Sequence, residues 1–111
     1  MRRFPRLGGV VGAALAIALT VAAAGCGGGG EAKPTTGPEV YKAYCSTCHG
    51  VDGQGGVGPK LAGVVAEKYP NIDDQIAVVT NGKGTMPSWR GRLTPQQIRR
   101  VVVYERTKLG Q

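Results

Sequence analysis

The sequence feature that most constrains this chain is a pentapeptide with two cysteines and a histidine, Cys45-Ser46-Thr47-Cys48-His49. A C-x-x-C-H pattern is typical of covalent attachment of a c-type haem. Residues three apart lie on one face of a helix, so Cys45 and Cys48 can both reach vinyl groups on one edge of a porphyrin. His49 follows directly and can bind the iron from one side. The motif therefore predicts a chain that folds around a bound haem.

The rest of the sequence favours haem over two other uses of a C-x-x-C pair. A zinc site needs a second pair of ligands. However, His49 is the only histidine, and the one further cysteine, Cys26, lies in a different segment. A thioredoxin-like dithiol is expected within a βαβ pattern, and the sequence shows none. A dithiol redox site and a zinc site shared between chains remain the alternatives.

A second axial ligand can be sought among the methionines, because the chain has no second histidine. Met86 and Met1 are the two methionines, and Met1 belongs to a segment that we expect to be removed. If the iron takes two protein side chains of the usual kinds, these are His49 and Met86. The alternative is that Met86 is an ordinary core residue.

The first 25 residues have the layout of an export signal. Three arginines precede an apolar run from 7 to 24, and small residues lead into a cysteine. The segment Ala23-Ala24-Gly25-Cys26 resembles a bacterial lipoprotein box, although the position three before the cysteine is usually Leu. We expect a lipoprotein signal peptide over 1–25 and a lipid on Cys26. An uncleaved membrane anchor and a free thiol at Cys26 are the alternatives.

Residues 26–37 are rich in glycine and lack apolar periodicity, which predicts a flexible tether. The folded domain is then expected over 38–111, which is small for a self-sufficient core. A haem would supply the missing apolar surface. Of the net charge of +7, three charges belong to arginines of the signal segment, which leaves +4 for the rest. Charge therefore gives little support to nucleic-acid binding, and we expect none.

The domain is predicted to be all-α, with about four short helices. The first is expected from Pro38 to His49, because proline suits the first turn and apolar residues recur at helical spacing. The glycine-rich stretch 50–63 lacks the strand and the Gly-Lys-Ser/Thr ending of a phosphate-binding loop. We expect it to pass close to a flat cofactor, with a plain surface loop as the alternative. A short helical piece is predicted over 61–68.

Two further helices carry end signals. One is predicted to start after Asn71 and to end at Asn81-Gly82, with acidic residues in its first turn. The last is marked by a Thr94 cap, Pro95 in its first position and Gln97 at the place of a capping-box partner. Its inward face is expected to hold Ile98, Val101, Val102, Tyr104 and Leu109, and its arginines, Arg99, Arg100 and Arg106, are expected mainly toward solvent.

The region from Pro38 to Leu109 resembles the small class I cytochromes c. Four features carry the resemblance, namely the 45–50 motif, the Gly-Pro-Lys-Leu-Ala-Gly run over 58–63, the 81–87 segment with its Met-Pro pair, and a closing helix with Tyr104. The resemblance implies a fold in which the first and last helices cross and the other helices wrap one covalent haem c. One departure is Glu105, where members commonly carry an apolar residue.

The resemblance also implies roles for individual residues. Cys45 and Cys48 would hold the haem, and His49 and Met86 would be its axial ligands. Two further residues, Pro59 and Leu61, would act around them. The Pro59 carbonyl would bind the other nitrogen of His49, and Leu61 would pack on the haem.

Function follows from the coordination. An iron with side chains on both axial sides passes single electrons, and the sequence shows no carboxylate pair or Ser/His pair for enzymatic chemistry. We expect a monomeric electron carrier, not an enzyme, that is lipid-anchored on the outer face of the cytoplasmic membrane and serves redox proteins of a respiratory chain. A haem subunit bound in a larger dehydrogenase or oxidase is the main alternative. A gas sensor or peroxidase would need a labile Met86.

A basic rim for docking an acidic partner is a further expectation. It would be formed by Lys42, Lys60, Lys83, Arg90 and Arg92. The alternative is an ordinary solvated surface.

Overall fold

The computed structural model describes Gly8, Gly9, Gly12 and residues 32–111. The chain divides into two units, Met1–Gly30 and Glu31–Gln111. The expected signal peptide over 1–25 lies outside the described residues apart from those three glycines, and so does Cys26. Of the expected tether over 26–37, only 32–37 are described.

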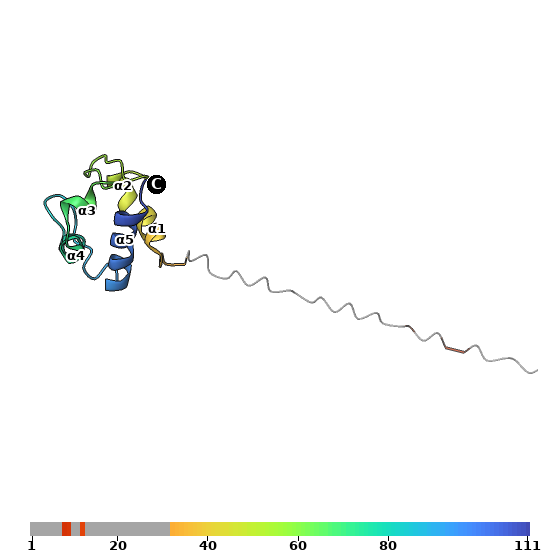
Figure 1. The fold of residues 1–111 in the computed structure, drawn as a ribbon. Coiled ribbons are helices and arrows are strands. Elements are labelled where there is room, and N and C mark those ends of the chain that lie inside the picture. Colours follow the sequence, from red (N-terminus) through yellow and green to blue (C-terminus); the bar gives the residue numbers. More distant parts are fainter. Residues whose placement is uncertain (1–7, 10–11, 13–31) are drawn as a thin grey trace, which may run out of the picture. The chain divides into compact units, whose positions relative to one another are not determined.

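The second unit is helical (Figure 1). Its first helical run consists of three consecutive elements, followed by three separate helices: α1 (Gly37–Val40), η1 (Tyr41–Cys45), α2 (Ser46–His49), α3 (Val65–Lys68), α4 (Ile72–Asn81) and α5 (Pro95–Thr107). Among the described residues, β-type pairing is limited to two isolated bridges. The prediction of an all-α domain with about four short helices is confirmed.

The helix starts follow from local side-chain chemistry. The Thr36 hydroxyl accepts from the backbone N–H of Glu39, whose carboxylate accepts from the Thr36 N–H in return. Thr94 and Gln97 form the same reciprocal capping box at α5, as predicted. Asn71 caps α4 with its side-chain oxygen. Each cap satisfies backbone donors that the first helical turn leaves free.

The first run contains a π-helical turn that the sequence pattern did not predict. Within η1 the hydrogen bonds span five residues, and the N–H of Ser46 still bonds to the carbonyl of Tyr41. A π-turn widens one turn of a helix and is frequent at functional sites. Here it ends at Cys45, so it affects how the cysteine motif is placed on the helical run.

The core lies where the first run meets α5. Val40, Tyr41, Val101 and Val102 are fully buried there, and the rings of Tyr41 and Tyr104 pack with their centroids 5.7 Å apart. Gly37 allows this approach, because a Cβ on it would lie 2.5 Å from the carbonyl oxygen of Arg100. The expected crossing of the first and last helices is therefore present, and its closeness depends on a glycine.

One expectation for α5 was wrong. Arg106 does not point mainly toward solvent, but reaches across to the segment before α4 and donates to the carbonyl oxygens of Tyr69 (2.7 Å) and Pro70 (3.2 Å). Arg99 and Arg100 are exposed, as expected. Arg106 thus ties the end of α5 to the start of α4.

Within the part of the chain that is described, no helix combines the length and the apolar character needed to cross a bilayer.

Candidate functional site

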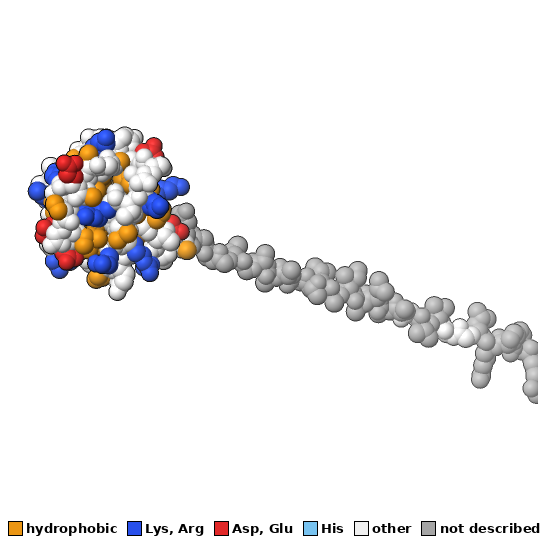
Figure 2. Space-filling model, viewed as in Figure 1, with side chains coloured by type: hydrophobic (Ala, Val, Ile, Leu, Met, Phe, Trp, Pro, Cys, Tyr) orange, Lys and Arg blue, Asp and Glu red, His pale blue; other side chains and the backbone are white. Residues whose placement is uncertain are grey.

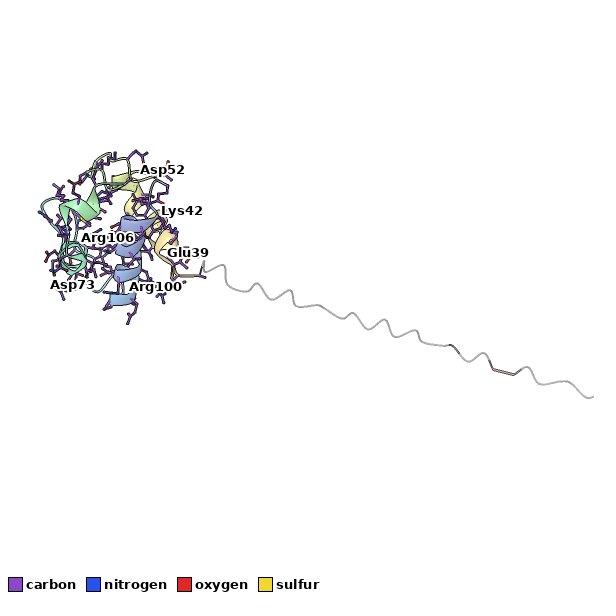
Figure 3. The ribbon with its side chains drawn as sticks, in the orientation of Figure 1. Glu39, Lys42, Asp52, Asp73, Arg100 and Arg106 are labelled. Carbon is purple, nitrogen blue, oxygen red and sulfur yellow. The ribbon has the colours of Figure 1, made fainter. Side chains whose placement is uncertain are left out.

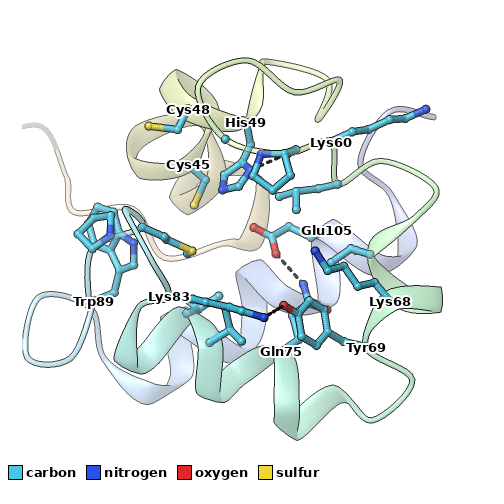
Figure 4. Close-up of a pocket in the computed structure, with 18 of the residues that line it drawn as sticks. Cys45, Cys48, His49, Lys60, Lys68, Tyr69, Gln75, Lys83, Trp89 and Glu105 are labelled. Carbon is cyan, nitrogen blue, oxygen red and sulfur yellow. Dashed lines mark hydrogen bonds between the residues drawn. The ribbon is translucent and has the colours of Figure 1, made fainter.

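The first run, the loop after it, α4 and the segment around Met86 enclose a cavity of about 280 Å³. Its wall is mainly apolar, with contributions from Val65, Val79, Pro87 and Trp89. The size is at the lower end for cavities that hold small molecules and cofactors. Figure 4 shows Cys45 and His49 reaching it from one side and Tyr69 and Gln75 from the other. We call this space the central cavity.

Both cysteines of the motif line the central cavity. They are free thiols, Cys45 buried and Cys48 exposed. Burial raises the pKa of the Cys45 thiol to about 12, and the nearby Glu105 carboxylate adds to that rise. The thiol is therefore neutral at the cavity wall. Two thiols one helical turn apart suit a cofactor that is attached along one edge.

His49 is held by the loop that follows it. Its Nδ1 lies 2.8 Å from the carbonyl oxygen of Pro59, and because a carbonyl only accepts, Nδ1 must carry the proton. The other nitrogen, Nε2, is then left with a free lone pair for a metal. Gly58 makes room for the ring, since a Cβ there would lie 2.8 Å from the imidazole Cε1. The sequence thus fixes the orientation of the ring and the tautomer in which Nε2 can bind a metal.

The segment after α4 brings Met86 to the same cavity as His49. Lys83 and Met86 exchange backbone hydrogen bonds of 3.2 and 3.0 Å, which close a tight turn around Gly84. Met86 is partly buried. Leu61 also lines the cavity and packs against the main core. All six site residues that were predicted within the folded domain therefore meet at one place; Cys26 lies outside the described residues.

Two buried polar residues in the wall were not predicted as part of the site, although Glu105 stood out in the sequence as a departure from class I members. Glu105 and Gln75 are 5% and 3% exposed, and the amide Nε2 of Gln75 donates to Oε2 of Glu105 over 2.8 Å (Figure 4). Helical spacing could have predicted that Glu105 faces inward, because it lies four residues after Val101 and four before Leu109. Gln75 follows two aspartates at the start of α4 and gave no such signal.

The basic residues divide into two groups. Lys60 and Lys83 line the central cavity as expected for a rim, and Lys68, which was not predicted, joins them. Lys83 also donates to the Tyr69 hydroxyl over 3.3 Å. Lys42, Arg90 and Arg92 are exposed but are not part of this wall.

The surface as a whole is mixed in character. Figure 2 shows Lys and Arg side chains spread over the visible face of the unit, between hydrophobic patches. Lys42 lies beside Glu39 on the side where the chain enters α1 (Figure 3). The predicted rim therefore corresponds to the local group around the cavity and does not extend to all five residues.

The donor set of the cavity fits a haem c. It offers two thiols, an imidazole whose Nδ1 is bonded to Pro59, a thioether and an apolar wall. In the described residues, no three His, Cys, Asp or Glu side chains come together to hold a metal ion by themselves. An iron that arrives inside a porphyrin needs only axial ligands from the protein, and this is what the cavity provides.

Comparison with known proteins gives the same picture. Residues 32–104 match the family described as cytochrome C oxidase, cbb3-type, subunit III. Cytochrome c6 of Leptolyngbya boryana is 36% identical over 76 residues, which cover 66% of this chain and 89% of that protein. The FixP subunit of the cbb3-type cytochrome c oxidase from Azorhizobium caulinodans is 35% identical over 78 residues, but these cover only 27% of its length.

The fold is shared with solved structures. Cytochrome c6 of the diatom Phaeodactylum tricornutum aligns with a TM-score of 0.54 and 31% identity, over 62% of this chain and 85% of that one. Cytochrome cL of Methylophaga aminisulfidivorans aligns with a TM-score of 0.58, at 24% identity.

Proposed function

Because this chain belongs to the class I cytochromes c, in which one covalent haem c carries single electrons, we propose that Cys45 and Cys48 form the thioether bonds and that His49 and Met86 are the axial ligands. The chain is a monohaem c-type electron carrier and not an enzyme. The assignment of these four residues is supported by their position on one cavity and by the hydrogen bond that fixes the His49 tautomer.

The residues of the cavity determine how the electron is handled. A haem held by these residues would supply one-electron redox chemistry. The Pro59 carbonyl fixes the tautomer and the orientation of His49, so that the same imidazole would serve both oxidation states. The Met86 thioether is a weak donor that would favour Fe(II) and raise the reduction potential. The apolar wall would exclude water from the cofactor. With His49 and Met86 both bound to the iron, a substrate would find no free coordination site.

Replacement of Met86 by alanine tests the ligand assignment. We expect loss of the near-infrared sulfur-to-iron band and a lower midpoint potential, with the haem still covalently attached. Val78→Ala is the matched control, because Val78 lines the same cavity but carries no ligand atom; it should keep both the band and the potential. If Met86→Ala keeps the band, the thioether is not the ligand.

The location of the carrier is a further part of the proposal. We infer that 1–25 is a lipoprotein signal, that Cys26 carries the lipid, and that the residues between Cys26 and the cap of α1 tether a monomeric domain to the outer face of the cytoplasmic membrane. There it exchanges electrons with redox proteins of a respiratory chain. The sequence of the leader supports this. In a bacterial host fed a labelled fatty acid, the wild type should incorporate the label and Cys26→Ser should not. A wild-type protein without label would contradict the lipid anchor.

A second candidate is an electron-transfer subunit bound permanently in a larger oxidase or dehydrogenase. The matching family is described as an oxidase subunit, and one relative is the FixP subunit of a cbb3-type oxidase. Size-exclusion chromatography of the native, detergent-solubilised protein separates the two candidates. Elution as a small haem protein favours the free carrier, whereas stable co-elution with a catalytic subunit favours the bound one.

A further inference from the structure

Glu105 places an ionisable carboxyl in the wall of the haem cavity, where the electron-transfer chemistry derived above makes no use of it. It is 5% exposed and belongs to α5, the helix that closes the core against the first run. A buried carboxylate without a compensating charge is costly. In the described part of the chain, it accepts a hydrogen bond from Gln75 and forms no ion pair. The group is therefore either neutral or balanced by a charge that the cavity receives.

The hydrogen bond to Glu105 is oriented by a third residue. Arg106 donates from Nη1 to Oε1 of Gln75 over 3.0 Å, so the amide oxygen of Gln75 is already occupied. The amide nitrogen of Gln75 must then be the atom that faces Glu105, at 2.8 Å. A donor aimed at a carboxyl group favours its ionised form. Arg106 thus acts on Glu105 through Gln75 and does not neutralise it by direct contact.

The other groups around Glu105 come from several elements. Two of them, Tyr41 and Cys45, belong to η1. The charge of Glu105 contributes to the raised pKa of both groups. The Tyr41 hydroxyl donates to the carbonyl of Gly50 instead of to Glu105. Several further titratable or charged side chains line the same cavity. They are Tyr44 from η1, Cys48 and His49 from α2, Lys60 from the loop, Lys68 from α3, and Tyr69 and Lys83 from the segments beside α4.

Burial and hydrogen bonding act on Glu105 in opposite directions. Burial raises the pKa of the Glu105 carboxyl to about 7, and the bond from Gln75 opposes that rise. A carboxyl with such a pKa changes charge near neutral pH. An electron that enters the cavity removes one positive charge from the iron, which favours the neutral form of a neighbouring carboxyl.

We propose that Glu105 is a redox-linked proton acceptor: it binds protons from bulk water more tightly once an electron has arrived from the donor protein, and it releases them to bulk water as the electron leaves to the acceptor. The proposal rests on the proposed haem site. Proton uptake of this kind compensates part of the charge that the electron brings. At an effective dielectric constant of about 20 and a separation on the order of 10 Å, reduction should raise the proton affinity on the order of tenfold.

Redox titration as a function of pH tests the proposal on the full haem protein. Between about pH 5 and about pH 9, on either side of the Glu105 transition, the midpoint potential should fall as pH rises. Each tenfold difference in proton affinity between the two oxidation states corresponds to about 59 mV of total fall. Glu105→Gln keeps the shape and removes the charge, so its potential should stay flat and close to the acidic plateau of the wild type.

Three further variants complete the test. Glu67→Gln makes the same exchange at an exposed site on α3 and should leave the wild-type profile unchanged. Gln75→Leu removes the donor that favours ionisation, so the fall should move to higher pH. If Glu105→Gln folds poorly, Glu105→Leu supplies the apolar residue common in class I members and should also be flat.

The outcomes separate this proposal from the haem assignment. A lost c-type spectrum in the wild type would overturn the haem site itself. With that spectrum intact, a flat wild-type profile would overturn the role of Glu105. So would a profile that persists in both Glu105 variants, because the titrating group would then be another one, such as a haem propionate. An infrared band of a protonated carboxyl that appears on reduction and is absent in Glu105→Gln would support the proposal directly.

Discussion

Gly58 is the position where a single methyl group should disturb the function most directly. A Cβ at Gly58 would lie 2.8 Å from Cε1 and 2.9 Å from Nδ1 of His49. Ordinary contacts begin at 3.4 Å, so the ring would have to retreat by about 0.6 Å. The hydrogen bond from Nδ1 to Pro59 is 2.8 Å long, and a shift of that size takes it beyond the usual range. Gly58→Ala should therefore weaken the support of the axial imidazole.

Overpacking of this kind costs about 1–3 kcal/mol, and the net value of the hydrogen bond is about 1 kcal/mol. We expect the free energy of unfolding of Gly58→Ala to fall by about 2–4 kcal/mol. The midpoint potential should rise, because an imidazole without its acceptor is a weaker donor to Fe(III). Denaturant unfolding and redox titration of the haem protein measure the two effects.

Gly56→Ala is the matched control, because it makes the same exchange in the same loop. A Cβ at Gly56 would meet only the carbonyl oxygen of Cys48, at 3.2 Å. Neither Gly56 nor Gly58 has a positive φ, so the effect of alanine on the unfolded chain is shared and cancels in the comparison. The control should cost less than about 1 kcal/mol and keep the wild-type potential. Equal losses in the two variants, with both potentials unchanged, would refute the reasoning.

Three further predictions concern the core, the buried acid and the rim. Val101→Ala removes a fully buried side chain and should cost about 1–3 kcal/mol, whereas Val103→Ala at a site 40% exposed should cost less than about 0.5 kcal/mol in the same unfolding assay. The pKa of Glu105 is about 7 in the folded chain against 4.5 ordinarily, so the folded state binds more protons between these values. Stability of the reduced protein should then fall by up to about 3 kcal/mol as pH rises from 4.5 to 7, and Glu105→Gln should remove that slope. Charge reversal at Lys60 and Lys83 should slow electron transfer to an acidic partner at low salt and have little effect at high salt, as stopped-flow kinetics would show.

The sequence predicted the helices well because their ends carry strong local signals. Thr94, Pro95 and Gln97 define a start almost without reference to the rest of the fold, and the structure shows the capping box that they imply. The cavity residues were predicted for a different reason. A C-x-x-C-H motif limits the chemistry so strongly that a single remaining methionine became the natural second ligand, and Met86 does line the cavity.

Long-range polar contacts escaped prediction because they have no local signal. Arg106 follows Glu105 on α5, and its partners Tyr69 and Pro70 lie more than 30 residues away in sequence. The π-turn of η1 was missed as well, because its apolar spacing over a few residues is close to that of an α-helix. Both features depend on how the elements pack together.

The arrangement of charge around the cavity connects these observations. Three lysines line it, Lys60, Lys68 and Lys83, together with one carboxyl group, that of Glu105. The lysines are exposed, so water and salt screen their effect on the iron and leave them suited to meeting a partner. Glu105 is buried, so its effect on the iron is screened much less. Exposed charge should therefore govern the rate of encounter, whereas the buried carboxyl should govern the potential and its dependence on pH.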